Sequence, residues 1–502
     1  MTIIKPLREF AVQQPNKPAI ITKNRNITYG CLYQRINRIS RALMDKQIPS
    51  EKVQQKVGIL LGNRTEFLEF FISAAAIGAV AVVFDTKWTA KDLTGKIKEC
   101  QPDILITESA YADKLGRQTS ETKMVWVDHP DDEQWLRSFS DKPLKKDVPG
   151  DALFYMGFTS GTTGDPKGFL RTQDSWVETF RISNVEFGIS KDDHILSPGP
   201  FVHSLSLYAA VYSLFIGATF YMEPSFRASS LLALFREYPI SVVYVVPTML
   251  KSILHRAQGL DHWPDLRKII SSGDKLDAST KEKFSLTFSD VDLYEYYGAS
   301  ELSFVTVLDP TGNREKPDSV GRPFENVTIS IRDKHGHDVP PGQVGTLYVK
   351  SPMVFSHYFG NPEETAKVLR NGWATVGDIA YQDDKGYIYL VGRKKNMIIG
   401  GGLNIYPAEV EKLLLQHPEV QEAVVVGVKD RFWGEKVVAA ITGHGVTEID
   451  ERSVRRFCRE RLSRYKNPRR IHLFEQFPYT SSGKIAREKV KQMILTREDE
   501  VR

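Results

Sequence analysis

The sequence is poor in cysteine: its 502 residues include only Cys31, Cys100 and Cys458. Their spacing fits neither a disulfide framework nor a zinc site. A long apolar run is also lacking, because the most apolar stretch, residues 70–84, contains Gly78 and is too short to cross a bilayer. The first residues contain no apolar core like that of a signal peptide. These absences predict a cytoplasmic protein in a reducing compartment, without a transmembrane segment.

Charge of one sign is not in large excess, since 67 basic and 62 acidic residues give a formal net charge of +5. So small an excess does not indicate nucleic-acid binding, although it suits anionic phosphorylated ligands. Internal repeats and low-complexity tracts are absent, which argues against a scaffold protein. The hydrophobic fraction of 41% is ordinary for a globular protein, so the function has to be sought in the motifs.

The pattern of apolar residues predicts an α/β fold with layered sheets, and the length favours two or three domains. Residues 31–45 have apolar side chains at helical spacing, whereas residues 57–61, 240–246 and 268–272 resemble buried strands. Buried strands between helices are typical of layered α/β sheets. Residues 326–351 resemble two strands joined by a Gly/Pro turn, which predicts a β-rich subdomain.

A segment rich in glycine and hydroxyl side chains follows the strand-like residues 153–158. It reads T-S-G-T-T-G-D-P-K-G from Thr159 to Gly168. Backbone N–H groups and hydroxyls can converge there on one anion, and a lysine adds positive charge. The order of a Walker A loop is absent. The segment therefore predicts a different phosphate-binding loop, with the candidate ligands Thr159, Ser160, Gly161, Thr162, Thr163, Gly164 and Lys167.

Three more motifs follow in order: Y-Y-G-A-S-E at 296–301, W-A-T-V-G-D at 373–378 and P-Y-T-S-S-G-K at 478–484. With the loop they span nearly the whole chain. The set resembles the motifs of the adenylate-forming superfamily, which includes acyl-CoA synthetases, firefly-type luciferases and the adenylation domains of peptide synthetases. The resemblance implies a large N-terminal domain of several subdomains, residues 1–394, and a small mobile α+β C-terminal domain, residues 395–502.

The resemblance also implies roles for the second motif. Tyr297, followed by Gly298, would stack on the adenine of ATP, and Ser300 would contact the α-phosphate. Glu301 would hold Mg²⁺, which agrees with the preference of this ion for carboxylate oxygens when it bridges phosphates. Ser300 replaces the commoner threonine and keeps its hydroxyl.

The third and fourth motifs complete the implied nucleotide site. Asp378 would accept hydrogen bonds from the ribose hydroxyls, and Arg393 would reach the ribose from the other side. Val376 departs from the usual threonine. Lys484 is the strongest catalytic candidate, because an ammonium between the carboxylate and the phosphate would offset the repulsion of two anions.

In the family, the C-terminal domain rotates between two half-reactions. The matching hinge is Asn396 or its neighbour Lys395, where most members have aspartate. Gly401 and Gly402 would then line the channel for the pantetheine arm of coenzyme A. Residues 452–470 contain nine basic residues against one acid, and their basic face is either a guide for the phosphates of coenzyme A or a solvated helix face.

The implied acyl pocket contains Phe201, Val202, His203, Gly273 and Tyr296. Amino-acid-activating relatives have aspartate at the position of Val202, so no carboxylate is present here to balance a buried ammonium. His203 resembles the pocket-wall histidine of acyl- and aryl-CoA ligases and not an acid–base catalyst. A fatty, branched or aromatic acid is expected, and its chain length depends on the depth of the pocket.

The sequence thus predicts an ATP-dependent acid–CoA ligase that forms acyl-AMP and then acyl-CoA, with ATP, Mg²⁺ and coenzyme A as ligands. An enzyme that loads the phosphopantetheine of a carrier protein is the alternative, and a non-catalytic acyl-nucleotide sensor is a remote one. No nucleic-acid partner is expected. Loose peripheral contact with a membrane and either a monomer or a homodimer are compatible with the sequence.

Overall fold

The computed structural model describes residues 2–45, 54–116, 122–159, 166–259, 263–400, 403–443, 449–480 and 485–500. The chain forms two compact units. The first contains Met1–Thr328 and Val349–Ala374, and the second contains Ile329–Tyr348 and Thr375–Arg502. The sequence analysis placed a domain boundary between residues 394 and 395. That boundary describes which residues would rotate together during the reaction, and it stays a prediction.

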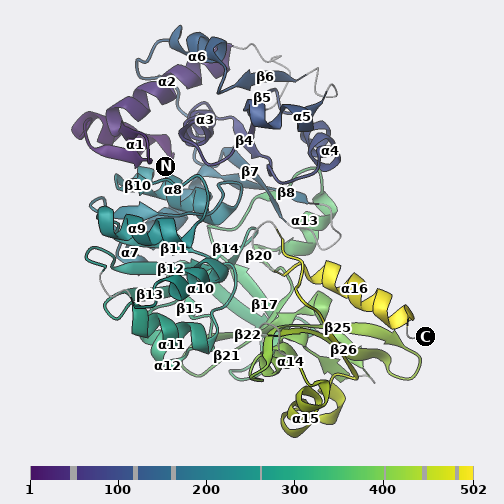
Figure 1. Ribbon diagram of the computed structural model, residues 1–502. Helices are drawn as coiled ribbons and strands as arrows, with labels where there is room; N and C mark the ends of the chain where they lie inside the picture. Colours follow the sequence, from purple (N-terminus) through teal and green to yellow (C-terminus); the bar gives the residue numbers. More distant parts are fainter. Residues whose placement is uncertain are drawn as a thin grey trace. The chain divides into compact units, whose positions relative to one another are not determined.

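The first unit contains a seven-stranded sheet (Figure 1). Its strands, in order across the sheet, are β18 (His357–Tyr358), β8 (Lys167–Thr172), β7 (Leu153–Thr159), β4 (Val80–Val83), β3 (Lys56–Leu60), β5 (Ile104–Thr107) and β6 (Lys123–Trp126). The strands from β7 to β6 pair in parallel, and β8 pairs antiparallel with both β7 and β18. The apolar runs of β3, β4 and β5 are almost entirely buried, as expected for parallel strands covered on both faces.

The second sheet of this unit has nine strands. In order they are β15 (Arg322–Pro323), β14 (Ser303–Leu308), β13 (Asp292–Ala299), β12 (Lys268–Ser272), β11 (Val242–Val245), β9 (His194–Leu196), β10 (Thr219–Tyr221), β1 (Pro18–Ile21) and β2 (Asn26–Thr28). The strands from β13 to β1 are parallel, and the edge strands are antiparallel. The predicted buried strands at 240–246 and 268–272 are confirmed as β11 and β12.

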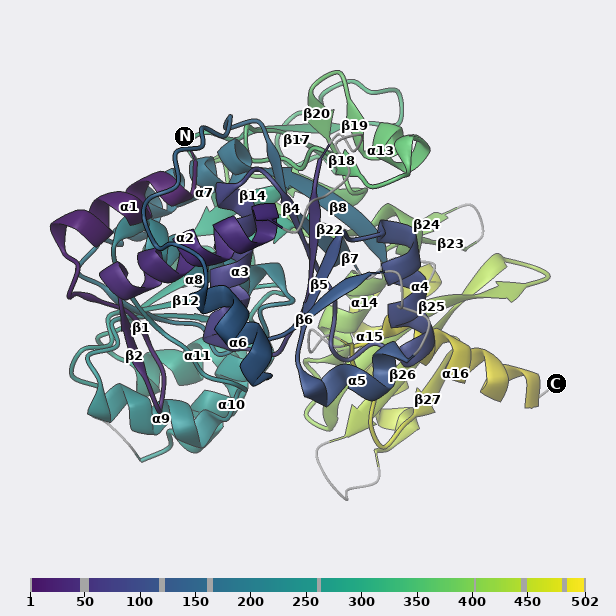
Figure 2. The same ribbon diagram turned by 90° about the horizontal axis from the view of Figure 1, so that it is seen from above.

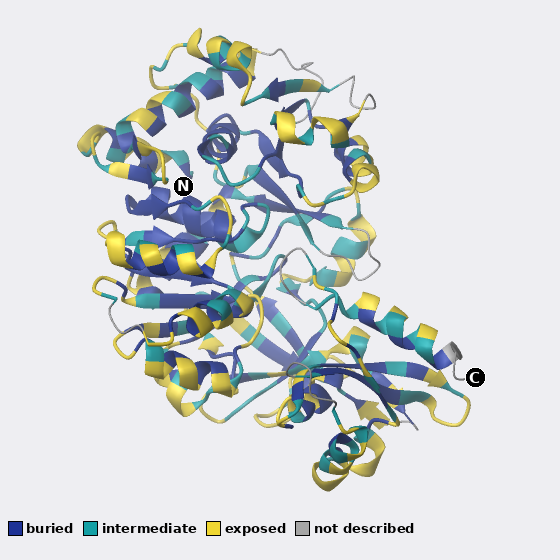
Figure 3. Cartoon of the chain, in the orientation of Figure 1, coloured by how far each residue is buried: buried dark blue, intermediate teal, exposed yellow. Residues whose placement is uncertain are grey.

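Helices cover both faces of the nine-stranded sheet. Val243 and Val245 of β11 pack with α9 (Ala228–Glu237), α10 (Pro247–Arg256) and α11 (Ala278–Thr287). Helices α7 (Gln173–Phe187) and α8 (Ser204–Ile216) lie on the other side (Figure 2). Helix α8 is apolar around its whole circumference and is buried from Ser206 onward, as a central helix must be (Figure 3).

The other helices and short strands of the first unit complete its layers. They are α1 (Ile4–Gln13), α2 (Tyr29–Asp45), α3 (Thr65–Ala76), α4 (Ala90–Cys100), α5 (Ala112–Leu115), α6 (Pro130–Arg137), α12 (Pro310–Glu315), α13 (Pro362–Val368), β19 (Leu369–Arg370) and β20 (Trp373–Ala374). Helix α2 confirms the helix expected at 31–45. No helix in the described ranges is both long enough and apolar enough to span a bilayer.

The second unit is an α+β structure. Its strands are β16 (Thr328–Arg332), most of β17 (Gly345–Lys350), β21 (Asp378–Gln382), β22 (Ile388–Arg393), β23 (Ile398–Gly400), β24 (Leu403–Ile405), β25 (Val420–Asp430), β26 (Gly434–Gly443) and β27 (Arg470–Leu473). Alternate residues of β25 pack on α14 (Pro407–Leu414) and α15 (Glu451–Arg461) or on α16 (Arg487–Glu500). An α/β fold with a larger N-terminal and a smaller C-terminal part is therefore confirmed.

Candidate active site

The structure places the two ends of the predicted phosphate loop opposite each other. Thr159 ends β7 and Lys167 begins β8, and the two residues pair in the antiparallel ladder. The intervening candidates, Ser160, Gly161, Thr162, Thr163 and Gly164, lie outside the described residues. Lys167 therefore lies at the base of the hairpin. The seven-stranded sheet, and not the loop, sets the position of its backbone.

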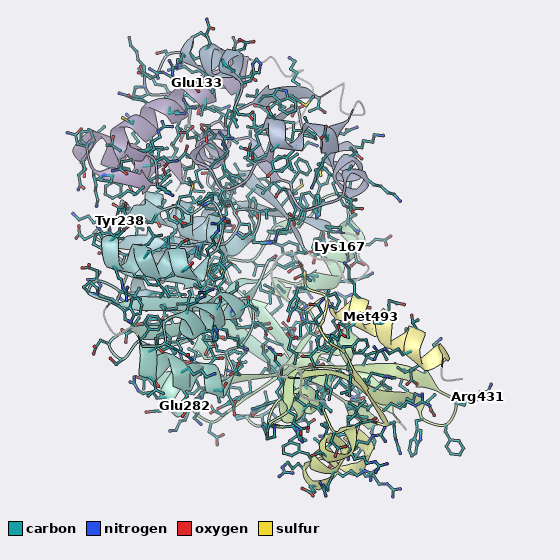
Figure 4. All side chains as sticks on the ribbon, viewed as in Figure 1. Glu133, Lys167, Tyr238, Glu282, Arg431 and Met493 are labelled. Atoms are coloured by element: carbon teal, nitrogen blue, oxygen red, sulfur yellow. The ribbon has the colours of Figure 1, made fainter. Side chains whose placement is uncertain are left out.

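Lys167 contacts helix α13, which the sequence analysis did not associate with the loop. Its Nζ lies 2.5 Å from Oε2 of Glu364 and 5.8 Å from the centre of the Tyr358 ring (Figure 4). Lys367 binds the second oxygen of Glu364 at 2.5 Å. Hydrogen bonds from Lys167 and Lys367 lower the pKa of the Glu364 carboxyl to about 2. Since both partners of the Lys167–Glu364 pair are partly exposed, the pair contributes little to stability.

Glu301 is a buried carboxylate held from two directions. Its Oε1 accepts a hydrogen bond of 2.6 Å from the Tyr358 hydroxyl, and its backbone oxygen accepts one of 2.8 Å from the N–H of Phe355. Burial, together with the nearby Glu301 carboxylate, raises the pKa of Tyr358 well above its usual value, so the hydroxyl remains a donor. The bond from Tyr358 occupies one of about four lone-pair sites of the Glu301 carboxylate, which leaves it able to bind a metal ion.

Gly298 shapes the turn that carries Ser300 and Glu301. A Cβ atom at Gly298 would lie 2.0 Å from the backbone oxygen of Ser303, because β13 and β14 approach closely where their register shifts. Ser303 has a φ of +60°, which turns the chain back into β14. Tyr297 and Ser300 are partly exposed, whereas Glu301 is buried. The predicted adenine and phosphate contacts therefore come from one strand end and its turn.

The residues of this turn fit a magnesium ion that is shared with a nucleotide. No group of three or more His, Cys, Asp or Glu side chains that could hold a metal occurs in the part of the chain that the structure describes. A dedicated protein cage is therefore not built from those residues. Mg²⁺ is commonly bound by one or two carboxylates with phosphate oxygens and water, and Glu301 can supply such a carboxylate.

Asp378 and Arg393 form a pair within the second unit. They face each other across β21 and β22, and Nε of Arg393 donates to Oδ1 of Asp378 at 2.8 Å. Asp378 is buried, whereas the arginine side chain is 45% exposed. The preceding turn depends on Thr375, whose hydroxyl accepts from the N–H of Gly377 at 3.2 Å and donates to the Leu347 carbonyl at 2.7 Å. The side-chain hydrogen bonds of this turn therefore involve the Thr375 hydroxyl and not Val376.

The structure describes only some of the other residues that were predicted to be functional in the second unit. Lys395 and Asn396 lie in a short 3-10 helix, Lys394–Asn396, and burial together with nearby Arg393 lowers the pKa of Lys395. Gly401, Gly402 and Lys484 lie outside the described residues. The hinge, the channel and the catalytic lysine thus stay predictions.

Four of the predicted acyl-pocket residues lie in loops next to a helix or a strand, and the fifth, Tyr296, lies on a strand. Phe201 is buried against Phe67, and its N–H donates to Oδ1 of Asn63 at 2.8 Å. Val202 and His203 are partly exposed immediately before α8. Gly273 follows β12 with a φ of +101°, a conformation that favours glycine. Tyr296 lies on β13 with its ring 4.2 Å from that of Phe304.

The sequence analysis missed Tyr358 and Glu364. An Asn361–Pro362 pair with an acid at Glu364 does signal a helix start, and Asn361 indeed caps α13 by accepting from the Glu364 N–H at 3.0 Å. That signal indicates only local structure. The contacts with Lys167 and Glu301 arise because β18 pairs with β8.

Two family models match the chain. One, described as AMP-binding enzyme, matches residues 7–359, and the other, described as AMP-binding enzyme C-terminal domain, matches residues 409–484. The chain belongs to the AMP-binding enzyme family. The predicted membership of the adenylate-forming superfamily is thereby confirmed.

This AMP-binding enzyme is 38% identical to an uncharacterized acyl–CoA ligase, YhfT, of Bacillus subtilis, over 98% of both chains. It is 30% identical to VraA of Staphylococcus aureus, named a putative long chain fatty acid-CoA ligase, also over 98% of both. Its structure matches ATP-bound MatB from Rhodopseudomonas palustris with a TM-score of 0.90 and 25% identity, covering 98% of this chain and 99% of that one. The predicted enzyme class, an AMP-forming acyl-CoA synthetase, is confirmed.

Proposed function

We propose that this AMP-binding enzyme joins an apolar carboxylic acid to coenzyme A in two steps. The carboxylate first attacks the α-phosphate of ATP, and pyrophosphate leaves to give acyl-AMP. The thiol of coenzyme A then attacks the acyl carbonyl, and AMP leaves. The observation that supports this most is the first-unit arrangement in which Glu301, Tyr358, Glu364 and Lys167 are connected at the base of the phosphate loop.

In the first step, the loop residues between Thr159 and Lys167 would bind the phosphates of ATP. Lys167 would exchange Glu364 for a phosphate oxygen, and Ser300 would donate its hydroxyl to the α-phosphate. Mg²⁺, held by Glu301 when bound, would neutralise charge on the phosphate oxygens. Lys484 would orient the acid carboxylate and offset its repulsion from the phosphate.

The nucleoside part of ATP would be bound by Tyr297 and Asp378. Tyr297 offers a ring at the end of β13. Asp378, oriented by Arg393, would accept hydrogen bonds from the ribose hydroxyls. For the second step we propose a hinge at Lys395 or Asn396, between domains 1–394 and 395–502. Gly401 and Gly402 would line the path of the thiol.

The acid is proposed to be apolar and to lack an α-ammonium group. Val202, in the pocket wall with Phe201, His203, Gly273 and Tyr296, supplies no carboxylate for a buried ammonium. The Staphylococcus relative named as a fatty acid–CoA ligase supports an apolar acid.

A pyrophosphate-release assay with a panel of acids, run with and without coenzyme A, tests this function. We expect acid-dependent release and a matching acyl-CoA by mass spectrometry. Acid-dependent release without acyl-CoA would contradict coenzyme A as acceptor and favour a carrier protein. An absence of release with every acid would contradict the proposal.

The role of Lys484 is tested by separating the two steps. Lys484→Ala is expected to lose acid-dependent pyrophosphate release and to keep thioester formation from supplied acyl-AMP. Lys489→Ala, a change of an exposed lysine on α16, is the matched control and should leave both steps intact. Equal loss of both steps in Lys484→Ala would contradict the assigned role.

A further inference from the structure

The depth of the acyl pocket determines which acids fit, and one group of aromatic rings bears directly on that depth. We call it the aromatic cluster. It consists of Tyr296 and the rings behind it: Phe180, Tyr208, Tyr212, Tyr244 and Phe304. Its members come from α7, α8, β11, β13 and β14 of the first unit.

The rings of the cluster contact one another without interruption. The centre of the Tyr296 ring lies 4.2 Å from that of Phe304, and the Phe304 ring lies 4.9 Å from that of Tyr208. Tyr208 in turn lies 5.4 Å from Phe180 and stacks on Tyr212 at 5.6 Å. These separations are those of packed aromatic pairs. The space that leads from Tyr296 to α7 and α8 is therefore filled by side chains.

Tyr208 fixes the centre of the cluster. Its hydroxyl lies 2.7 Å from Oγ of Ser183 and donates to the Thr179 carbonyl at 3.1 Å, so the ring is tied to α7 at its outer end. The residue is 5% exposed. A ring that is packed on several sides and hydrogen-bonded at its tip cannot swing aside without breaking those bonds.

A second route for an acyl chain, past the aromatic cluster and through the nine-stranded sheet, is blocked by strand β11. Along β11, Val243 and Val245 face the core formed with α9, α10 and α11. Tyr244 points to the other face, where its ring lies 6.4 Å from that of Tyr208, and it is fully buried. The cluster is thus backed by a strand whose own side chains are committed on both faces.

We infer that the aromatic cluster closes the acyl pocket behind Tyr296, so this enzyme takes short or compact acids, such as short-chain, branched or single-ring acids, and rejects long-chain fatty acids. Phe304, which packs directly on Tyr296, and Tyr208, which lies behind Phe304, together determine the limit. The inference rests on the proposed function, which places Tyr296 in the wall of the acyl pocket. It departs from the printed name of the Staphylococcus relative, which concerns that protein.

The test compares kcat/KM for butanoate, hexanoate, benzoate, dodecanoate and hexadecanoate in the wild type, Tyr208→Ala and Tyr208→Phe. The wild type is expected to favour the three smaller acids by at least about tenfold. Tyr208→Ala should shift the preference toward dodecanoate and hexadecanoate, because it removes the ring that fills the space behind Phe304 and leaves room for Phe304 to move back. Tyr208→Phe keeps the ring and should keep the wild-type order of acids.

A second variant guards against a folding defect in Tyr208→Ala. Phe304→Leu removes less volume from the same wall and should extend the accepted acids by a smaller step, with thermal unfolding checked for both variants. A wild type that prefers dodecanoate or hexadecanoate, or folded variants with an unchanged order of acids, would overturn the inference. Pyrophosphate release with any acid supports the proposed function independently of this order, so the two failures are distinct.

Discussion

Tyr358 shows how much of this site depends on a single residue that lies far from it in the sequence. Its hydroxyl donates to Glu301 across 57 positions, and both side chains are buried. A hydrogen bond to a buried carboxylate does two things here. It satisfies one oxygen, and it restrains the carboxylate that we propose as a metal ligand.

Tyr358→Phe removes that donor and leaves the ring in place. We expect the first unit to lose about 1.5–3 kcal/mol of stability, since a bond to a charged group is lost and a buried oxygen is left unpaired. We also expect a higher Mg²⁺ concentration to be needed for pyrophosphate release. Urea denaturation and Mg²⁺ titration measure the two effects.

Tyr238→Phe is the matched control, because it removes a hydroxyl at the end of α9, and Figure 4 shows Tyr238 well away from Lys167, which contacts Tyr358. It should change neither the urea midpoint nor the Mg²⁺ dependence. If Tyr358→Phe behaved in the same way as this control, the hydrogen bond to Glu301 would have no role in positioning.

At the scale of elements, the close approach of β13 and β14 explains the glycine of the Y-G motif. A Cβ at Gly298 would meet the backbone of Ser303, which cannot move away without breaking the ladder. Gly298→Ala is therefore expected to lower the melting temperature and to displace Ser300 and Glu301. Gly95→Ala lies inside the exposed part of α4, where nothing lies within 4 Å, and should stabilise by up to about 1 kcal/mol.

Thermal unfolding of the two glycine variants checks this contrast. Both substitutions add one methyl group. The opposite signs of the two expected stability changes therefore come from the surroundings of each glycine. Equal or reversed shifts would show that the β13–β14 hairpin can relax, and the steric reason for Gly298 would be wrong.

Helix α13 gives a pH-dependent contribution through Glu364. Its two lysine partners lower the pKa of the carboxyl from 4.5 to about 2. The paired carboxylate therefore stabilises the fold fully above about pH 4.5, and this contribution is lost as the pH falls toward 2. Because the pairs are partly exposed, we expect about 1 kcal/mol or less.

Melting temperatures of the wild type and Glu364→Gln, compared from pH 7 down to pH 3, measure this contribution. The difference should be constant near neutral pH and shrink below pH 4.5. Glu363→Gln, a change at the exposed neighbouring acid, should show little difference at any pH. A difference that grew on acidification would contradict the assignment.

At the scale of the whole molecule, each compact unit has a hydrophobic core of its own. One core of the first unit includes Val243 and Val245, whereas Val425 and Val426 of the second unit point to two separate clusters. Chains with more than one compact unit commonly depart from two-state unfolding, so we expect the two-state description to fail for the intact chain. Scanning calorimetry is expected to give a van't Hoff enthalpy below the calorimetric enthalpy.

A non-hydrolysable acyl-AMP analogue tests which transition belongs to the nucleotide site. At 100 times its dissociation constant, such a ligand should stabilise the folded protein by about 2.7 kcal/mol. We expect at least one of the transitions to move to higher temperature, because the proposed nucleotide ligands include residues of both units. A single transition with equal enthalpies, unchanged by the ligand, would contradict both expectations.

The sequence by itself determined the family, the α/β class and the main strands and helices. A short run such as residues 268–272 has the length of a strand and is too short for a helix, so its length and composition predicted the strand that is observed. The phosphate loop and the Y-G motif were visible because chemistry at one anion needs adjacent glycines, hydroxyls and charges. These residues are adjacent in the sequence, so the sequence alone reveals the motifs.

Only the tertiary structure decided which distant side chains contact the candidate site residues and how the aromatic cluster is packed. Tyr358 and Glu364 meet Glu301 and Lys167 because β18 pairs with β8, and no local pattern specifies a strand partner. The aromatic cluster draws rings from five elements, each of which is an ordinary core residue in its own segment. Pocket depth is a property of packing, so it exists only once those elements are assembled.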